Sequence, residues 1–572
     1  MSCPGSKTHV LSERLLLTFF LGVNFISYSQ SLENLAEKKP IKINGGISAS
    51  QIFYAANGIN NRRDPYSYFL TGNINLSLYG WSVPFSFALS NQNRSISQPF
   101  NQFGLHPTYK WATAHIGYAS MNFSPYTLSS HIFRGVGVDL SPGKFHFSAM
   151  FGNLQRAVAW DTLVNSKPAF SRDGFGMKTG YRNGNDYAEV SLFHGEDNIY
   201  SIPVIPNDDS LIPEENMVIG FSLSKSLLDK IILTSELGTS AITRDKKVER
   251  GNERIPFSQL GFDSRLSTSY YNAIKAGINY REETYAVGLG YERIDPGYKT
   301  HGAYYFNNDL ENYTVNASTA LLQSRLNLAA SVGLQHDNLD KTKISTMNRV
   351  VASLNAAYAP TPKLSLTANY SNFQSYTNIR SQFVNINQLT PYDNLDTLRF
   401  TQLTQSINLG SNYMLGGDGV KKQFISVNFS LQDAAEQQSQ VEQNSGSRFY
   451  NINTTYSVNF APSELTLSFS YNANQNRGVT SDLITHGPSA TANKSLLQRK
   501  LRVTLGGAFN HSVSEGKTIN QILNLRSAAG YVLAKKHNIN LGIVMVNRHS
   551  KGNTGPQSFA EFTGTLTYSY SF

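Results

Sequence analysis

The sequence predicts an all-β protein, a transmembrane antiparallel β-barrel of about 24–26 strands over residues 41–572, with no N-terminal plug domain. Three observations predict this fold: an export-type N-terminus, no later apolar run of the ~20 residues that a membrane helix needs, and alternation of apolar and polar residues along most of the remaining chain. Only 15% of the 572 residues are charged and 12% are aromatic, which excludes a disordered chain and a coiled coil.

Residues 1–30 have the pattern of a cleaved signal peptide rather than an anchoring helix. Lys7 and Arg14 precede an apolar stretch, "LLLTFFLGVNFISY", and small and polar residues follow it. The apolar stretch is shorter than a membrane-spanning helix requires. Export to the outer membrane is therefore expected.

The mature chain is expected to begin near Ser31, with residues 31–40 forming a short periplasmic segment before the first strand. The one cysteine, Cys3, lies before the apolar stretch and would be removed with the signal. Disulfides, thiolate catalysis and cysteine metal sites are therefore excluded.

The final segment shows the alternation most clearly. In "EFTGTLTYSYSF", apolar residues and Gly564 share one face, while Thr and Ser occupy the other. The same rhythm recurs in residues 450–460 and 464–472. A soluble β-sandwich also alternates, but its polar face carries many charged residues, whereas this one carries Ser, Thr, Asn, Gln and Gly. A barrel with one face toward lipid is therefore favoured over a sandwich or a repeat solenoid.

Short and long connections take turns along the chain, as in barrels with short periplasmic turns and longer external loops. The tight turns contain Pro and are exemplified by residues 141–144, 359–363 and 461–464. The longer polar loops are predicted at residues 373–399, 432–448, 472–483 and 548–558. Residues 91–128 fit this scheme poorly and are predicted to hold a strand, a hairpin or an inward-folded constriction.

A barrel of 24–26 strands is wide enough to leak unless something narrows it. Barrels of 22 strands carry a plug domain in the lumen, but only about ten residues separate the predicted cleavage site from the first strand. Narrowing is therefore expected from a flattened barrel, from a partner protein, or from inward-folded loops at residues 91–128, 153–172, 240–267 and 374–399.

The run "FNQFGLHPTYKWATAHIGYASMNFSPYTLSSHIFRGVGVDLSPGKFHFSAMFG", residues 100–152, resembles the N-terminal part of large outer-membrane β-barrels of the Bacteroidota type. The signal end "SYSQ" and the aromatic last strand fit the same group. The resemblance implies an outer-membrane barrel that the barrel-assembly machinery inserts, with Phe572 as a recognition residue. It implies no characterised activity.

No enzyme is predicted, and no cofactor or metal. The chain has no G-x-S-x-G elbow, P-loop or zinc-binding helix motif. The densest histidines, His106, His115, His131 and His146, have no metal-ligand spacing. Acidic residues at 196, 197, 208 and 209 are interpreted as solvated loop charges. Gly288 and Gly290 are expected to let the wall pack closely against a loop.

The predicted function is a wide pore for passive or semi-selective passage of solutes. Arg349, Arg502 and Arg526 lie on the polar faces of their strands and are candidates to set the lumen charge. The net charge of +10 mildly favours anionic or neutral solutes, but contact with lipid phosphates and solubility of the loops explain it better. The alternative is a non-enzymatic scaffold or conduit of a secretion, assembly or uptake complex, with a plug or a lipoprotein partner filling the bore. Outer-membrane lipid is an expected partner, and nucleic acid is not.

Overall fold

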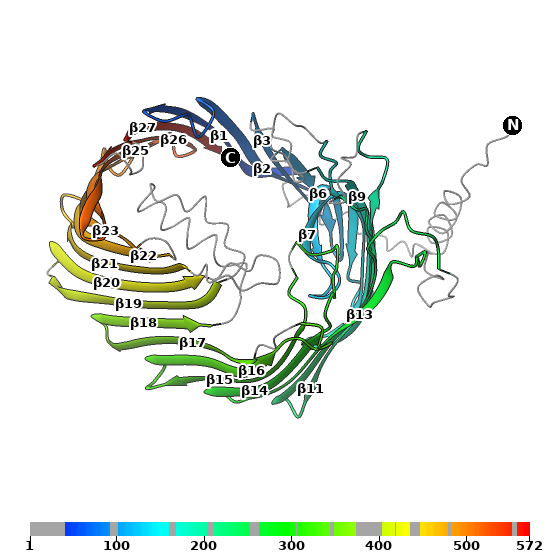
Figure 1. Cartoon of the computed structure of the whole chain (residues 1–572). Coiled ribbons are helices and arrows are strands. Elements are labelled where there is room, and N and C mark those ends of the chain that lie inside the picture. Colours follow the sequence, from blue (N-terminus) through cyan, green and yellow to red (C-terminus); the bar gives the residue numbers. More distant parts are fainter. Residues whose placement is uncertain are drawn as a thin grey trace, which may run out of the picture.

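Strands that alternate between apolar and hydroxyl-bearing residues close on one another in this chain to form one antiparallel barrel (Figure 1). The computed structural model describes residues 41–91, 101–159, 168–203, 211–251, 262–304, 306–343, 348–372, 403–417, 419–434, 447–478, 482–551 and 558–572. The predicted signal peptide and N-terminal segment, residues 1–40, lie outside these ranges. Within the described ranges, no helix has the length and apolar character of a membrane-spanning helix.

In chain order the strands are β1 (Ile41–Asn57), β2 (Tyr66–Leu78), β3 (Trp81–Ser90), β4 (Gln102–Leu105), β5 (Thr108–Tyr109), β6 (Ala112–Asn122), β7 (Ser129–Leu140), β8 (Phe145–Gln155), β9 (Ser171–Asn183), β10 (Asp186–Asn198), β11 (Glu215–Leu227), β12 (Ile231–Thr243), β13 (Thr268–Arg281), β14 (Tyr285–Ile294), β15 (Leu310–Leu321), β16 (Leu326–His336), β17 (Asn348–Thr361), β18 (Leu364–Ser371), β19 (Leu403–Gly417), β20 (Lys421–Ala434), β21 (Ser447–Phe460), β22 (Leu465–Arg477), β23 (Asp482–Leu496), β24 (Leu501–Ser514), β25 (Lys517–Leu533), β26 (His537–Ser550) and β27 (Phe559–Ser571).

The barrel closes where the first strand meets the last. β1 pairs with β2 on one side and with β27 on the other, in antiparallel register from Gly46 opposite Ser571 to Asn57 opposite Ala560. Closure removes the sheet edges, so every strand has two neighbours to satisfy its backbone groups.

The strand count resolves to an even number because β4 and β5 are two pieces of one interrupted strand. Both pair with β3 on one side and with β6 on the other. The interruption falls at His106 and Pro107, where proline has no backbone N–H to donate to a neighbouring strand. The 27 strands of the described chain therefore form a barrel of 26, inside the predicted range of 24–26.

The two faces of the sheet are distinguished by the connection between β14 and β15, part of which Figure 1 shows inside the ring of strands. The carbonyl oxygen of Lys299 in this connection accepts hydrogen bonds from Asn216 and Ser240, so these two residues face the lumen. Directly opposed residues share a face, and the register therefore carries this assignment around the sheet. The opposite face is apolar and exposed, as at Phe469 (54%) and Leu505 (56%), and forms the outer wall.

Several polar segments that were predicted as loops are strand. β22 continues through Arg477 and β26 through Ser550. The predicted boundaries were wrong because Asn472 and Asn474 lie on the lumen face, where amides belong in a water-filled barrel. Gly516, with a φ of 77°, permits the tight reversal between β24 and β25.

Candidate functional site: two loops docked in the lumen

Two connections fold inward and dock against the lumen face of the barrel: the β6–β7 loop (residues 123–128) and the β14–β15 loop (residues 295–304). Tyr298 Oη donates a hydrogen bond to the carbonyl oxygen of Tyr126 over 2.8 Å. Thr300 Oγ1 donates to the carbonyl oxygen of Thr127 over 2.7 Å, and the Ser129 N–H donates to the carbonyl oxygen of Gly302 over 2.8 Å. The two loops therefore hold each other, although about 170 residues separate them in sequence.

The aromatic rings of both loops pack into an apolar cluster on the wall, which we call the ring cluster. It consists of Tyr126, Val218, Ala273, Ile294 and Tyr298, all at most 5% exposed. Tyr126 Oη also donates to Glu292 of β14 over 2.8 Å, so its hydroxyl has a partner beside the cluster. Burial raises the pKa of both tyrosine hydroxyls above their ordinary value.

Two opposed glycines make room for the docked loops. Gly220 of β11 lies opposite Gly238 of β12. A Cβ atom at Gly238 would come within 2.6 Å of Tyr298 Oη and 2.7 Å of Tyr126 Cβ, and one at Gly220 would come within 2.7 Å of Thr127 Cγ2. These contacts are too close for any side chain, so the loops reach the wall only because it has no side chain at these two positions.

Gly288 and Gly290, which were predicted to play this role, do not. Their added Cβ atoms would meet Asn279 Oδ1 and Thr314 Oγ1, which are side chains of neighbouring strands rather than of a loop. The prediction was wrong because a glycine in a strand indicates from sequence that another group comes close, but does not identify that group.

A second apolar cluster fills the lumen side of β6–β10. Leu128 of the β6–β7 loop is fully buried there against side chains from four strands. The cluster consists of Ala119, Met121, Phe123, Leu128, Phe133, Met150, Leu154 and Phe193. An apolar lumen face is unusual in a water-filled barrel, and here it serves as the seat of the inward-folded loop.

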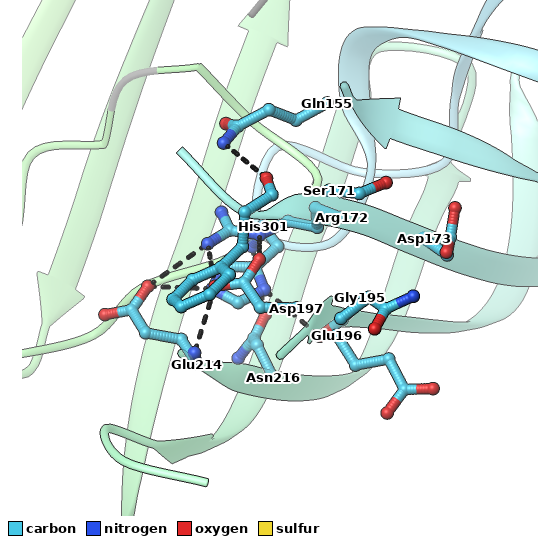
Figure 2. A network of polar contacts seen from close by, with 12 residues as sticks. Gln155, Ser171, Arg172, Asp173, Gly195, Glu196, Asp197, Glu214, Asn216 and His301 are labelled. Atoms are coloured by element: carbon cyan, nitrogen blue, oxygen red, sulfur yellow. Dashed lines mark hydrogen bonds and ion pairs between the residues drawn. The ribbon is translucent and has the colours of Figure 1, made fainter. Parts of the chain in front are cut away.

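A polar network ties the β14–β15 loop to the ends of β9, β10 and β11 (Figure 2). Arg172 forms a two-pronged ion pair with Asp197, with nitrogen–oxygen distances of 2.7 and 2.9 Å. Glu214 Oε2 lies 2.5 Å from Lys299 Nζ, 3.2 Å from His301 Nε2 and 3.5 Å from Arg172. Two residues of the loop are thereby anchored by one carboxylate.

Backbone groups complete the anchor. The His301 N–H donates to Asn216 Oδ1 over 3.0 Å, and His301 Nδ1 lies 3.1 Å from the carbonyl oxygen of Gly195. His301 is 2% exposed and Asn216 is fully buried. Buried polar groups that all have partners fix one arrangement, so the loop is held in register as well as in place.

Burial and neighbouring charges shift the pKa values of the ionisable groups in this network. Burial alone would raise the pKa of Glu214, but hydrogen bonds from His301 and Lys299 and their charges lower it to about 2. Burial lowers the pKa of His301 to about 4, and the nearby guanidinium of Arg172 acts in the same direction. At neutral pH the site therefore holds an ionised Glu214 and a neutral His301.

The other connections that were predicted to fold inward are described only in part. In the 240–267 segment, Phe262 packs on Met217 and Ala241 of the outer face, whereas Arg244 donates a hydrogen bond to the hydroxyl of the lumen-facing Tyr271 over 2.9 Å. Residues 252–261 lie outside the described residues, so the inward folding of this segment stays a prediction. The 153–172 segment forms a small bridge between Val158 and Ala169. Residues 374–399 lie outside the described residues.

The three predicted lumen arginines occupy lumen-facing register positions but are not brought together. Arg502 lies opposite Ser495 and Gly530, near the end of the barrel where β1 begins and β27 ends. Arg526 lies in mid-strand opposite Gly506 and Val544, and both side chains are exposed. Arg349 of β17 lies opposite Gln335, seven strands from Arg502, and its side chain is outside what the structure describes.

Phe572 lies at the seam of the barrel. Its N–H donates to the carbonyl oxygen of Gly45, and the Gly45 N–H donates to the Phe572 carbonyl oxygen, each over 3.0 Å. The ring stacks near Tyr570, with centroids 5.5 Å apart. The last residue is thus part of the closing strand pair.

The histidines and acidic residues singled out from the sequence form no metal site in the part of the chain that the structure describes. His106 and His115 do meet, with 3.0 Å between their Nδ1 atoms, and His115 Nε2 lies 2.8 Å from Asp139. Asp197, which was interpreted as a solvated loop charge, is only 3% exposed and pairs with Arg172, so that interpretation was wrong. Glu196, its neighbour, pairs with Lys246 at 2.8 Å.

Sequence reasoning missed the β14–β15 loop. A signal is present in the segment "GYKTHGAYYF", which has four aromatic residues and two glycines between two strands. Aromatic residues in a connection that is otherwise expected to face water indicate a packing partner. The partner itself, Tyr126, has no such mark.

No protein-family model and no curated protein sequence matches this chain. Among solved structures, it is similar to the translocation pore of the P pilus usher, with 10% identity and a TM-score of 0.40 over 93% of this chain and 100% of the other. It is also similar to the FrpB iron transporter (F5-1 variant) of Neisseria meningitidis, with 11% identity and a TM-score of 0.38 over 92% and 82%. A third is BauA, the ferric preacinetobactin receptor of Acinetobacter baumannii, with 9% identity and a TM-score of 0.34 over 92% and 81%.

Proposed function

We propose that the protein is an outer-membrane conduit whose bore is narrowed on one side by the two docked loops. The observation that carries the proposal is the seating of Tyr126 and Tyr298 on the lumen-facing Gly238 of a closed barrel with an apolar outer wall. An apolar exterior requires lipid around it, and a lumen lined by polar residues supports water inside it.

The docked loops reduce the cross-section of the conduit. They cover the wall at β10–β14, where the ring cluster and the Glu214 network hold them. A barrel of 26 strands is wider than the 16–18-stranded barrels that already contain aqueous channels. Loops that occupy part of that width make passage selective by size.

Planar-bilayer recording of the purified chain tests the proposal. The double variant Tyr126→Ala/Tyr298→Ala removes both rings from the wall, and truncation of a buried aromatic side chain costs about 3–5 kcal/mol at each site. We expect the variant to conduct more than the wild type, because loops without their anchors leave the wall. Tyr200→Ala is the matched control, since this loop tyrosine is 88% exposed and belongs to neither docked loop.

Two results would contradict the conduit. Wild-type protein that stays silent at high protein load, while its circular dichroism shows a folded barrel, excludes an open path. Equal conductance of the wild type and the double variant shows that the loops do not narrow the bore.

The second candidate is a scaffold whose partner fills the lumen. It is favoured by the width of the barrel, because the described docked loops lie against only one part of the wall. Gentle detergent extraction followed by size measurement separates the candidates: a scaffold copurifies with a stoichiometric partner, such as a plug or a lipoprotein, whereas a pore runs alone or as a small homo-oligomer.

Export by a cleaved signal peptide, membership of the Bacteroidota type, and recognition of Phe572 by the barrel-assembly machinery belong to the same proposal. The seam position of Phe572 supports the last of these, because a residue in the closing pair is the last to find its partner. Deletion of Phe572 should lower the yield of membrane-inserted barrel, measured by outer-membrane fractionation.

A further inference from the structure

We infer that the lumen of this conduit binds neutral polyhydroxylated solutes, such as oligosaccharides. They bind on an uncharged part of the wall, which differs in character from the charged part where the loops dock. The inference rests on the proposed function, because a solute must enter the barrel to reach the wall. It is carried by fifteen lumen-facing positions on β18–β22, which we call the amide wall.

The amide wall consists of three neighbouring rows, each running across the same five strands through directly opposed residues. The rows are Asn369–Asn408–Ser430–Asn451–Asn474, Thr367–Gly410–Asn428–Asn453–Asn472 and Ser365–Asn412–Ser426–Thr455–Ser470. At strand spacings of about 4.8 Å and about 3.4 Å per residue, the wall measures roughly 19 Å by 14 Å. This is a continuous surface of amides and hydroxyls with a single glycine.

No residue of the amide wall is charged. The lumen face of β9–β14 is the opposite, with ion pairs between Lys178 and Glu189 at 3.6 Å and between Lys275 and Glu292 at 3.8 Å. Arg182 and Glu236 add further charges there. One barrel therefore presents a charged side and an uncharged side to the same lumen.

Side chains of the wall hold one another in place while keeping hydrogen-bonding capacity. Thr455 Oγ1 lies 2.9 Å from both Asn453 Oδ1 and Ser470 Oγ. Asn474 Nδ2 donates to Asn472 Oδ1 over 2.7 Å, and Asn451 donates to Asn474. An asparagine amide offers two donors and an acceptor with two lone pairs, so one or two such bonds leave positions open.

Part of the wall is open to the lumen. Asn369, Thr367 and Asn428 are exposed, and Asn408, Asn451 and Asn453 are half-buried. Asn451 and Asn453 are half-buried and hydrogen-bonded within the wall, so they present a preorganised surface, which lowers the entropy lost on binding.

The chemistry of the wall selects its solute. A sugar hydroxyl donates and accepts hydrogen bonds, as the amides and hydroxyls of the wall do, so contacts form in either direction. A charged solute loses hydration at such a surface without gaining an ion pair, and an apolar solute would have to strip water from amides. Neutral polyhydroxylated solutes are the class that fits both conditions.

Calorimetric titration of the detergent-solubilised full chain with maltohexaose tests the inference whether or not the barrel conducts. Polyethylene glycol of similar size is the comparison solute, because its ether oxygens accept hydrogen bonds but it has almost no donors. We expect maltohexaose to bind and polyethylene glycol not to bind. Hexagalacturonate, a charged sugar of the same length, should bind more weakly than maltohexaose.

The variant Asn428→Leu/Asn453→Leu removes two directly opposed amides from the middle row. We expect it to weaken maltohexaose binding at least tenfold. Asn316→Leu is the matched control, since Asn316 is an exposed lumen asparagine on β15, outside the wall. Should the leucine pair fail to fold by circular dichroism, Asn428→Ala/Asn453→Ala serves instead, with the same expectation.

The inference is overturned if maltohexaose and polyethylene glycol bind alike, if neither binds, or if the wall variant binds maltohexaose as the wild type does. Conductance reports separately on the proposed function. A barrel that conducts ions but binds no sugar contradicts the amide wall alone, and a barrel that binds sugar on the wall but never conducts contradicts the conduit alone.

Discussion

Glu214 is the residue whose removal should release the β14–β15 loop most directly. Its carboxylate contacts Lys299 and His301 of the loop and Arg172 of β9, so Glu214→Gln removes one ionic centre from three partners at once. Glutamine keeps the length of the side chain and one acceptor oxygen. The substitution therefore tests charge rather than shape.

The shift in the pKa of Glu214 sets the size of the expected effect on loop docking. A fall from the ordinary value of 4.5 to about 2 corresponds to at most about 3 kcal/mol of extra interaction with the ionised carboxylate, at 1.36 kcal/mol per pKa unit. Because the docked pKa is the lower one, this stabilisation is complete above pH 4.5 and is lost as the pH falls toward 2. At pH 3 about 2 kcal/mol of it is already lost.

Hydrogen exchange of the loop amides is the assay, because docking protects the His301 and Ser129 N–H groups in hydrogen bonds to Asn216 and Gly302. We expect Glu214→Gln to accelerate exchange of residues 298–303 by up to two orders of magnitude at pH 7. Lowering the pH from 5 to 3 should destabilise the docked loop of the wild type and affect the variant less.

Glu196→Gln is the matched control. Glu196 lies near the same end of the barrel and pairs with Lys246 at 2.8 Å, but half of its side chain is exposed. An exposed pair contributes about 0–1 kcal/mol, so this variant should exchange nearly as the wild type does. Equal protection of the loop in the wild type and in Glu214→Gln would refute the claim that the network anchors it.

Three further predictions follow from the walls of the barrel. Gly238→Val should push the docked rings off the wall at a cost of about 1–3 kcal/mol and speed hydrogen exchange of the β14–β15 loop. Gly542→Val is the control and should leave this exchange unchanged, because its added Cβ meets Thr565 at the ordinary contact distance of 3.9 Å. Identical exchange in the two variants would contradict the docking of the rings on Gly238. Phe469→Arg on the outer face should destabilise the folded barrel by about 2–4 kcal/mol in chemical denaturation, whereas Ser470→Arg on the lumen face should be tolerated. A larger loss of stability in Ser470→Arg than in Phe469→Arg would mean that the two faces are assigned wrongly. Arg526→Glu changes the lumen charge by two units and should shift the reversal potential in a salt gradient toward cation selectivity; an unshifted potential removes Arg526 from the conducting path.

The strands themselves could be predicted from the sequence because period-two alternation is a local property. Tyr568 and Tyr570 face outward and Thr567 and Ser569 face inward as the pattern in the last segment predicts. The strand ends were less predictable, since Asn472–Arg477 is polar at five of its six positions and is therefore indistinguishable from a loop by composition.

The docked loops could not be predicted because their contacts are not local. Tyr126 meets Tyr298 across 172 positions of sequence, and the glycines that receive the two loops, Gly220 and Gly238, resemble the many other strand glycines. Only the register of β11 against β12 places those two glycines opposite each other. This docking site consists of positions that lack a side chain, so it can be recognised only once the pairing of the strands is known.

The uneven distribution of lumen charge is different, because it can be read from the sequence once the lumen-facing positions are known. Polar-face positions carry charge at Lys178, Glu236 and Glu292 but none from Ser365 to Ser470 apart from Lys422, at the end of β20, among the described residues. The charged side is also the side on which the loops dock, where a buried ion pair needs a partner to offset its lost hydration. The loops supply that cover, and the wall without charges needs none. On these two parts of the barrel the asymmetry of charge and the placement of the loops go together: beside the docked loops the lumen face carries paired charges, and on β18–β22 it is lined with amides and hydroxyls.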